Sequence, residues 1–154
     1  MNKKINTTGL AFLLALQELD SPLSEAEKRN LVEIGDQLDV QPKAWKSVTQ
    51  PLLLKTIEAN PQLNQRYQFY QSQLDAAGEI SRDLLPTEAE IRQLFFINLS
   101  SAIKGFVPDS ESTGYDRQIS NVMIVFSRSE NPEEAVKKLT FLDKVKQFLG
   151  RASQ

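Results

Sequence analysis

Cysteine and histidine are both missing from this chain of 154 residues. Without cysteine no disulfide can form, so the fold depends on its hydrophobic core alone. The two absences also exclude zinc sites built from these residues, Ser-His-Asp and Cys-His nucleophilic centres, and haem held by a proximal histidine. Carboxylate-bridged di-iron bundles need a Glu-x-x-His motif, so they are excluded too. We therefore expect no metal and no cofactor.

Glycine and long apolar runs are also scarce. The six glycines form neither a G-x-G-x-x-G motif nor a phosphate-binding P-loop motif. No apolar run reaches the ~18 residues that a membrane span needs. Lys3 and Lys4 before the apolar stretch 10–16 give the outline of a secretory signal, but no small-x-small cleavage site follows. We expect a first amphipathic helix here, and a cytoplasmic protein.

The overall composition is that of an ordinary globular domain. Hydrophobic residues make up 40% and charged residues 25% of the chain, and the net charge is −2. A chain of this length can bury a sizeable core. The slightly acidic balance argues against a dedicated nucleic-acid-binding protein, which usually carries a basic domain. The sequence predicts one domain over residues 1–154.

Signals for helix starts and ends recur along the chain, whereas no pair of alternating runs is joined by a hairpin turn. Ser or Thr followed three residues later by Glu makes a capping box, and Asn-Pro places a cap before the first helical position. The pattern predicts an all-α bundle of about seven helices. The expected ranges are 7–19, 24–38, 42–59 with a break at Pro51, 61–78, 87–105, 115–127 and 131–149, with a further uncertain helix over 79–85.

Two segments of the chain resemble each other. Residues 24–34 and 87–97 are identical at six of eleven positions, and an Asn-Pro pair follows each segment. Internal duplication would give two three-helix units, 24–78 and 87–149, with the polar loop 107–114 absorbing the extra length. Convergence on a common helix start explains the same likeness. Both interpretations stay open from the sequence.

Two predicted helices have unusually wide apolar surfaces. Residues 88–104 are apolar nearly all round, so we expect this segment to be the central helix of the core. On a single wheel drawn through 132–149, apolar residues spread over about 240°, whereas a core-facing helix needs a stripe of only about 100° or somewhat more.

Phe141, Val145 and Phe148 lie at one edge of that wide arc. One interpretation is that they meet a partner protein or a second copy of the chain, with Lys138 and Lys144 at the rim. The other is that the last helix is deeply embedded in the core. Residues 137–151 carry five basic residues against Asp143, a net charge of +4. Basic amphipathic helices of this kind also bind acidic partners or anionic surfaces.

Chemistry based on carboxylates is the main kind that remains. The close pairs all fall in the first turns of predicted helices, where the helix dipole explains them: Glu25 and Glu27, Glu88 and Glu90, Glu133 and Glu134. We therefore predict no enzyme, and no catalytic residues.

The predicted function is that of a non-catalytic interaction, regulatory or adaptor protein. It would bind a protein partner, or itself as a homodimer, through the basic C-terminal helix. The alternative is a small-molecule sensor or carrier with an apolar cavity among the helices, near Phe95, Phe96 and Phe106. A nucleic-acid partner is not expected.

Overall fold

The computed structural model describes residues 7–41, 44–78, 84–86, 88–95, 118–129 and 131–152. Every regular element in these ranges is a helix, which confirms the all-α prediction. The elements are α1 (Thr7–Gln17), α2 (Glu25–Val40), the π-helical turn η2 (Trp45–Thr49), α3 (Gln50–Glu58), α4 (Pro61–Ala77), α5 (Glu88–Phe95), α7 (Gln118–Ser127), α8 (Pro132–Ala135), the 3₁₀ turn η4 (Val136–Lys138) and α9 (Phe141–Ala152).

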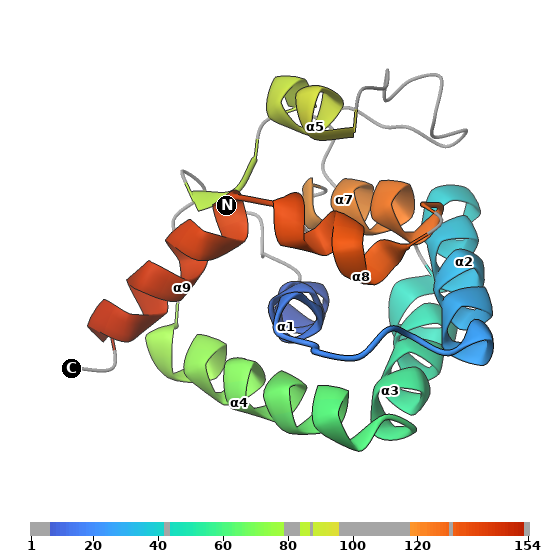
Figure 1. Ribbon diagram of the computed structural model, residues 1–154, viewed down its shortest axis with the longest axis horizontal. Coiled ribbons are helices and arrows are strands. Elements are labelled where there is room, and N and C mark those ends of the chain that lie inside the picture. Colours follow the sequence, from blue (N-terminus) through green and yellow to red (C-terminus); the bar gives the residue numbers. More distant parts are fainter. Residues whose placement is uncertain are drawn as a thin grey trace.

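The centre of the molecule is α1, which Figure 1 shows end-on with the other helices around it. Every residue from Gly9 to Leu16 is buried. The helix packs against α4, α7, α8, η4 and α9. A helix that is apolar all round must be enclosed on all sides. The first helix is thus present as predicted, but it is not amphipathic.

The prediction that 88–104 forms the central helix is wrong for the part that the structure describes. Of the α5 side chains whose burial is described, residues 89–93, Ile91 is buried and the other four are exposed. Figure 1 places α5 at the upper edge of the molecule, where it contacts α7. Residues 96–104 lie outside the described ranges.

The start of α2 confirms the first capping box. The Ser24 hydroxyl accepts a hydrogen bond from the Glu27 N–H at 3.1 Å, and the Glu27 carboxylate accepts from the Ser24 N–H at 2.9 Å. The second oxygen of Glu27 accepts from the Asn60 side-chain amide at 2.9 Å. Asn60 in turn caps α4 by accepting from the Leu63 N–H at 3.2 Å. One carboxylate therefore ties the starts of α2 and α4 together.

The break at Pro51 also occurs, and its form is a π-helical turn. Proline lacks the N–H that would continue an α-helical ladder. In η2 the ladder widens instead, and the Gln50 N–H donates to the Trp45 carbonyl five residues earlier. Pro51 then stands in the first turn of α3, where its missing N–H does no harm. Trp45 itself is buried.

The predicted last helix, 131–149, is divided in two. Pro132 begins α8, which passes into η4, and the backbone of Leu139 is no longer helical. Thr140 directly precedes α9, in the position where Ser, Thr, Asn and Asp are preferred. The break lets both segments turn apolar side chains inward, and Val136, Leu139 and Leu142 are all buried.

The internal duplication stays a prediction. The first Asn-Pro pair opens α4, which has 17 residues, whereas the second opens α8, which has 4. Asn131 makes no side-chain capping bond, in contrast to Asn60. Thr87, the cap of the second predicted capping box, lies outside the described residues. The two helices that begin at the Asn-Pro pairs therefore differ in length and in capping.

Two tyrosines of α4, Tyr67 and Tyr70, face α1. Their ionisation should lower the free energy of unfolding at alkaline pH. Burial raises the pKa of Tyr70 above its ordinary value of 10.0, and a hydrogen bond to Glu18 and that carboxylate's charge raise the pKa further. Burial also raises the pKa of Tyr67. The unfolded chain therefore loses these protons first as the pH rises above 10.

We expect the free energy of unfolding to fall above pH 10 by up to about 1.4 kcal/mol per pH unit for each such tyrosine. Tyr70→Phe removes one ionising group, so its stability should fall less steeply with pH. Urea denaturation at several pH values between 9 and 11 measures both slopes. Equal slopes in the wild type and the variant would contradict the burial of the Tyr70 phenol.

Candidate functional site

The burial pattern of α9 revises the predicted binding surface. Phe141 and Val145 are only 4% and 0% exposed, and both belong to the hydrophobic core. Neither is available to a partner in this conformation. Phe148 is half-buried and packs against the same core. Of the three apolar anchors predicted from the sequence, Phe148 alone keeps a substantially exposed surface.

A wheel drawn for α9 alone explains the difference. At about 100° per residue, the buried and half-buried apolar side chains span about 120°, which is the stripe that a core-facing helix needs. The wider arc predicted from the sequence came from one wheel drawn through the break at Leu139. The side chains in the stripe are Phe141, Leu142, Val145, Phe148 and Leu149.

The basic residues of this region divide into paired and unpaired ones. Lys137 forms an ion pair with Glu134 at 3.8 Å. The Lys146 ammonium lies 5.9 Å from the centre of the Tyr70 ring, within cation–π range. Lys138, Lys144 and Arg151 are exposed, and they make no hydrogen bond or ion pair with any residue that the structure describes. These three cations are available to an acidic group from outside.

Lys144 and Arg151 share one side of α9. They are seven residues apart, which places them on the same side of the helix and about 10 Å apart along its axis. Phe148 lies between them on the edge of the core-facing stripe. We call Lys144, Phe148 and Arg151 the α9 edge. Lys138 belongs to η4, before the break, and is not part of it.

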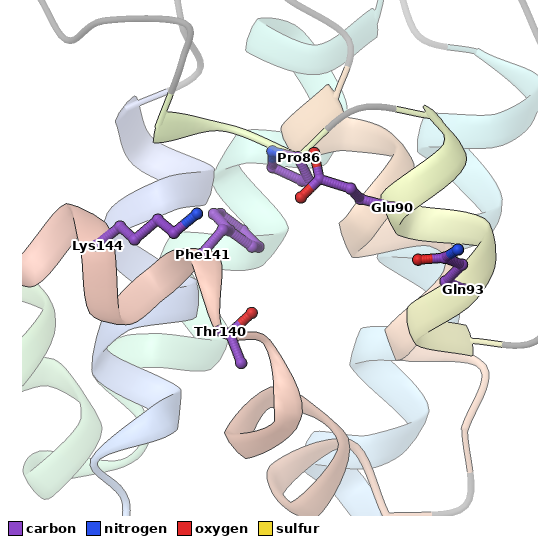
Figure 2. Close-up of a pocket in the computed structure, with 6 residues that line it drawn as sticks. All are labelled: Pro86, Glu90, Gln93, Thr140, Phe141 and Lys144. Carbon is purple, nitrogen blue, oxygen red and sulfur yellow. The ribbon is translucent and has the colours of Figure 1, made fainter.

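A cleft adjoins this edge, between α9 and α5. Its volume is about 220 Å³, and its described lining residues are Pro86, Glu90, Gln93, Thr140, Phe141 and Lys144. Figure 2 shows Phe141 and Lys144 on the α9 side, Glu90 and Gln93 on α5, and Pro86 between them. Of the residues predicted for binding, the cleft brings together Phe141 and Lys144. Val145, Phe148 and Lys138 do not line it.

Part of this site could be found in the sequence and part could not. Thr140, with acidic Asp143 three residues later, is a helix-start signal that would have revealed the break and the true stripe of α9. Glu90, Gln93 and Pro86 carry no such signal. They reach the cleft because α5 packs beside α7 and so comes opposite α9, which is a tertiary arrangement.

A second charged cluster joins α2 to α7. The Arg128 guanidinium donates to Asp39 at 2.9 Å and to Asp36 at 3.1 Å. Burial lowers the pKa of Arg128, but the hydrogen bonds and charges of Asp39 and Asp36 outweigh it and raise the pKa overall. Two carboxylates already neutralise this cation. We interpret the cluster as a structural clamp between the helices.

Two kinds of feature are absent from the described residues, a metal-ligand cluster and a membrane-spanning helix. No group of three or more acidic residues in these ranges is placed to hold a metal ion. None of the helices described above is both long and apolar enough to cross a membrane.

No family model, curated protein or solved structure matches the chain. Any proposal of function therefore depends on the geometry of the site alone, above all on the α9 edge.

Proposed function

We propose that this protein is a non-catalytic interaction protein that binds an acidic segment of a partner protein along the α9 edge. One observation carries the proposal. Two cations without a partner among the described residues, Lys144 and Arg151, flank the half-buried ring of Phe148 on a helix whose opposite side is fixed in the core. A rigid helix with this edge presents charge and apolar surface together.

The two kinds of side chain have different roles in such an interaction. An exposed ion pair contributes only about 0.2–1 kcal/mol, so Lys144 and Arg151 alone would bind weakly. Charges at a rim mainly speed association and select a partner of the opposite sign. Affinity comes from aromatic anchors that become desolvated. Phe148 is the candidate anchor of the α9 edge because it lies between the two cations.

The placement of the carboxylates supports a non-catalytic role. Glu25 and Glu27 lie in the first turn of α2, and Glu27 is occupied by capping and by Asn60. Glu133 lies in the first turn of α8, with Lys28 at 3.9 Å from its carboxylate. Glu27 and one oxygen of Glu133 are therefore held in structural contacts, and the helix dipole accounts for the exposed Glu25.

The α9 edge favours an unlike partner over a second copy of the chain. A twofold dimer brings the same patch of both copies together. Two α9 edges facing each other would oppose cations with cations. The alternative of a small-molecule carrier rests on a cavity near Phe95, Phe96 and Phe106, whose side chains lie outside the described residues. It stays a prediction.

Selection from a random 12-residue peptide library displayed on phage tests the proposal. We expect the enriched peptides to contain acidic residues, because Lys144 and Arg151 select for them. Lys144→Glu with Arg151→Glu should weaken binding of these peptides by at least about tenfold, since it replaces two attractions by two repulsions. Fluorescence anisotropy with labelled peptides measures the change, and binding to the wild type should weaken as salt rises.

Lys46→Glu with Lys55→Glu is the matched control. Both lysines are exposed in η2 and α3, and the double change alters the net charge by the same amount. The control should bind the peptides like the wild type, apart from a small general charge effect. Enriched peptides without acidic residues, or equal losses in both double variants, would contradict the proposal.

A further inference from the structure

We infer that the cleft between α5 and α9 receives an apolar side chain of the same acidic segment, next to the acidic residue that pairs with Lys144. This inference rests on the proposed function and adds a specificity pocket to it. It names the kind of sequence that the partner carries. The geometry, the size of the cleft and its continuity with the α9 edge lead to it.

The cleft combines an apolar wall with polar residues at its rim. Phe141 is nearly fully buried and Pro86 is buried, yet both contribute to the lining. Thr140, Gln93 and Lys144 are exposed and surround them. An apolar side chain placed against Phe141 and Pro86 would exclude water from the remaining part of the Phe141 ring. Its neighbours in a peptide would then lie beside the polar rim.

The size of the cleft fits one side chain better than a whole small ligand. Sites for drug-sized ligands usually measure about 300–1,000 Å³, whereas this cleft measures about 220 Å³. That volume holds about seven water molecules at ~30 Å³ each. Release of poorly ordered water by an apolar group favours binding.

Lys144 belongs to both the cleft and the α9 edge, and this sets the order of residues in the partner. An acidic residue pairs with Lys144 while an adjacent apolar residue enters the cleft. A second acidic residue reaches Arg151, about 10 Å further along α9. A polyproline II chain rises ~3.1 Å per residue and has three residues per turn, so acidic residues three positions apart lie on the same side of it, about 9 Å apart. The apolar residue then stands outside this pair, beside the acid that contacts Lys144.

The two walls of the cleft carry side chains of opposite charge. Glu90 places a carboxylate on the α5 side, while Lys144 places an ammonium on the α9 side (Figure 2). An acidic residue of the partner is therefore better placed toward α9. The apolar residue is the group that can lie between the walls.

The experiment combines changes in the peptide with changes that fill the cleft. The probes are the enriched 12-residue peptides and their single alanine variants. Gln93→Trp and Thr140→Trp each place a large side chain at the cleft from opposite walls, and both positions are exposed. Gln147→Trp is the control, because Gln147 is exposed on α9 and does not line the cleft. Because Thr140 directly precedes α9, Thr140→Trp can disturb the start of that helix. Gln93→Trp fills the cleft from α5 and leaves the start of α9 unchanged.

We expect alanine at the apolar peptide position to weaken binding to the wild type by about tenfold or more. On Gln93→Trp, the parent peptide should bind as weakly as its alanine variant, and the two should differ by less than about twofold. On Gln147→Trp, the full difference should remain. Circular dichroism confirms that each variant keeps its helices.

The outcomes separate this inference from the proposed function. One outcome is that acidic peptides that need Lys144 and Arg151 bind Gln93→Trp and Thr140→Trp as tightly as the wild type. That result would contradict binding in the cleft and would leave the proposed binding along the α9 edge intact. Peptides that fill the cleft without acidic residues would overturn the proposed function. A tenfold loss confined to the filled variants, with acidic residues about three positions apart, supports both.

Discussion

Val145→Asp is expected to abolish the cooperative fold at 25 °C. Val145 is fully buried in the core-facing stripe of α9. The change loses about 1.5–3 kcal/mol of apolar burial and adds several kcal/mol for a carboxylate without a partner in an apolar site. The sum approaches or exceeds the whole stability of a typical domain, about 5–15 kcal/mol. Circular dichroism at 222 nm during urea denaturation measures the loss.

Gln147→Asp is the matched control for this prediction. Gln147 is exposed on the same helix, two residues further on. The same new side chain should change the free energy of unfolding there by less than about 0.5 kcal/mol. A folded Val145→Asp protein with wild-type stability would mean that α9 is not embedded. Binding through Val145, as first predicted from the sequence, would then become tenable again.

Arg128→Met is expected to lower the free energy of unfolding by about 3–5 kcal/mol. The reason is Asp39, whose side chain is only 1% exposed and lies 2.9 Å from the guanidinium. Removing the cation takes the Arg128 counter-charge away from a buried carboxylate. Chemical denaturation at pH 7 gives the difference directly. Adding Asp39→Leu should recover a large part of the loss, because the buried charge is then gone.

Asp36 provides an internal comparison for the same clamp. Its side chain is 59% exposed and lies 3.1 Å from the same guanidinium. An exposed ion pair contributes only about 0.2–1 kcal/mol, so Asp36→Asn should cost no more than that. Equal costs for Asp36→Asn and Asp39→Asn would show that burial of Asp39 is not the cause.

Local signals in the sequence predicted the starts of helices well. Ser24 with Glu27 and Asn60 with Pro61 form their caps as expected, because each cap involves residues only three positions apart. Pro51 likewise acts through its own missing N–H, and the break in the helix occurs beside it. Such features depend little on the rest of the chain.

Predictions that required the tertiary arrangement were less successful. Apolar residues nearly all round 88–104 predict a central position for that segment, but α1 is also apolar all round and is the helix that the others enclose. Apolar content tells how much surface a helix must bury and not which neighbours bury it. The cleft depends on the same arrangement, since Glu90 lines it from α5, which packs on α7, and Lys144 lines it from α9.

The break at Leu139 shows how the position of a helix end affects the functional interpretation. A continuous helix over 131–149 implied apolar surface beyond the needs of the core, and hence an interface through Phe141 and Val145. Once α9 starts after Thr140, that excess disappears. What remains for a partner is the edge of the stripe at Phe148, with Lys144 and Arg151 beside it.

The enclosed position of α1 has a consequence for biosynthesis. This helix leaves the ribosome before every element that covers it, and η4 and α9 follow long after it. Until they emerge, the apolar residues from Leu10 to Leu16 stay partly exposed to water. A nascent chain with such a segment is exposed to aggregation and to capture by chaperones. The native fold of this protein is therefore completed only when the C-terminal helix has been made.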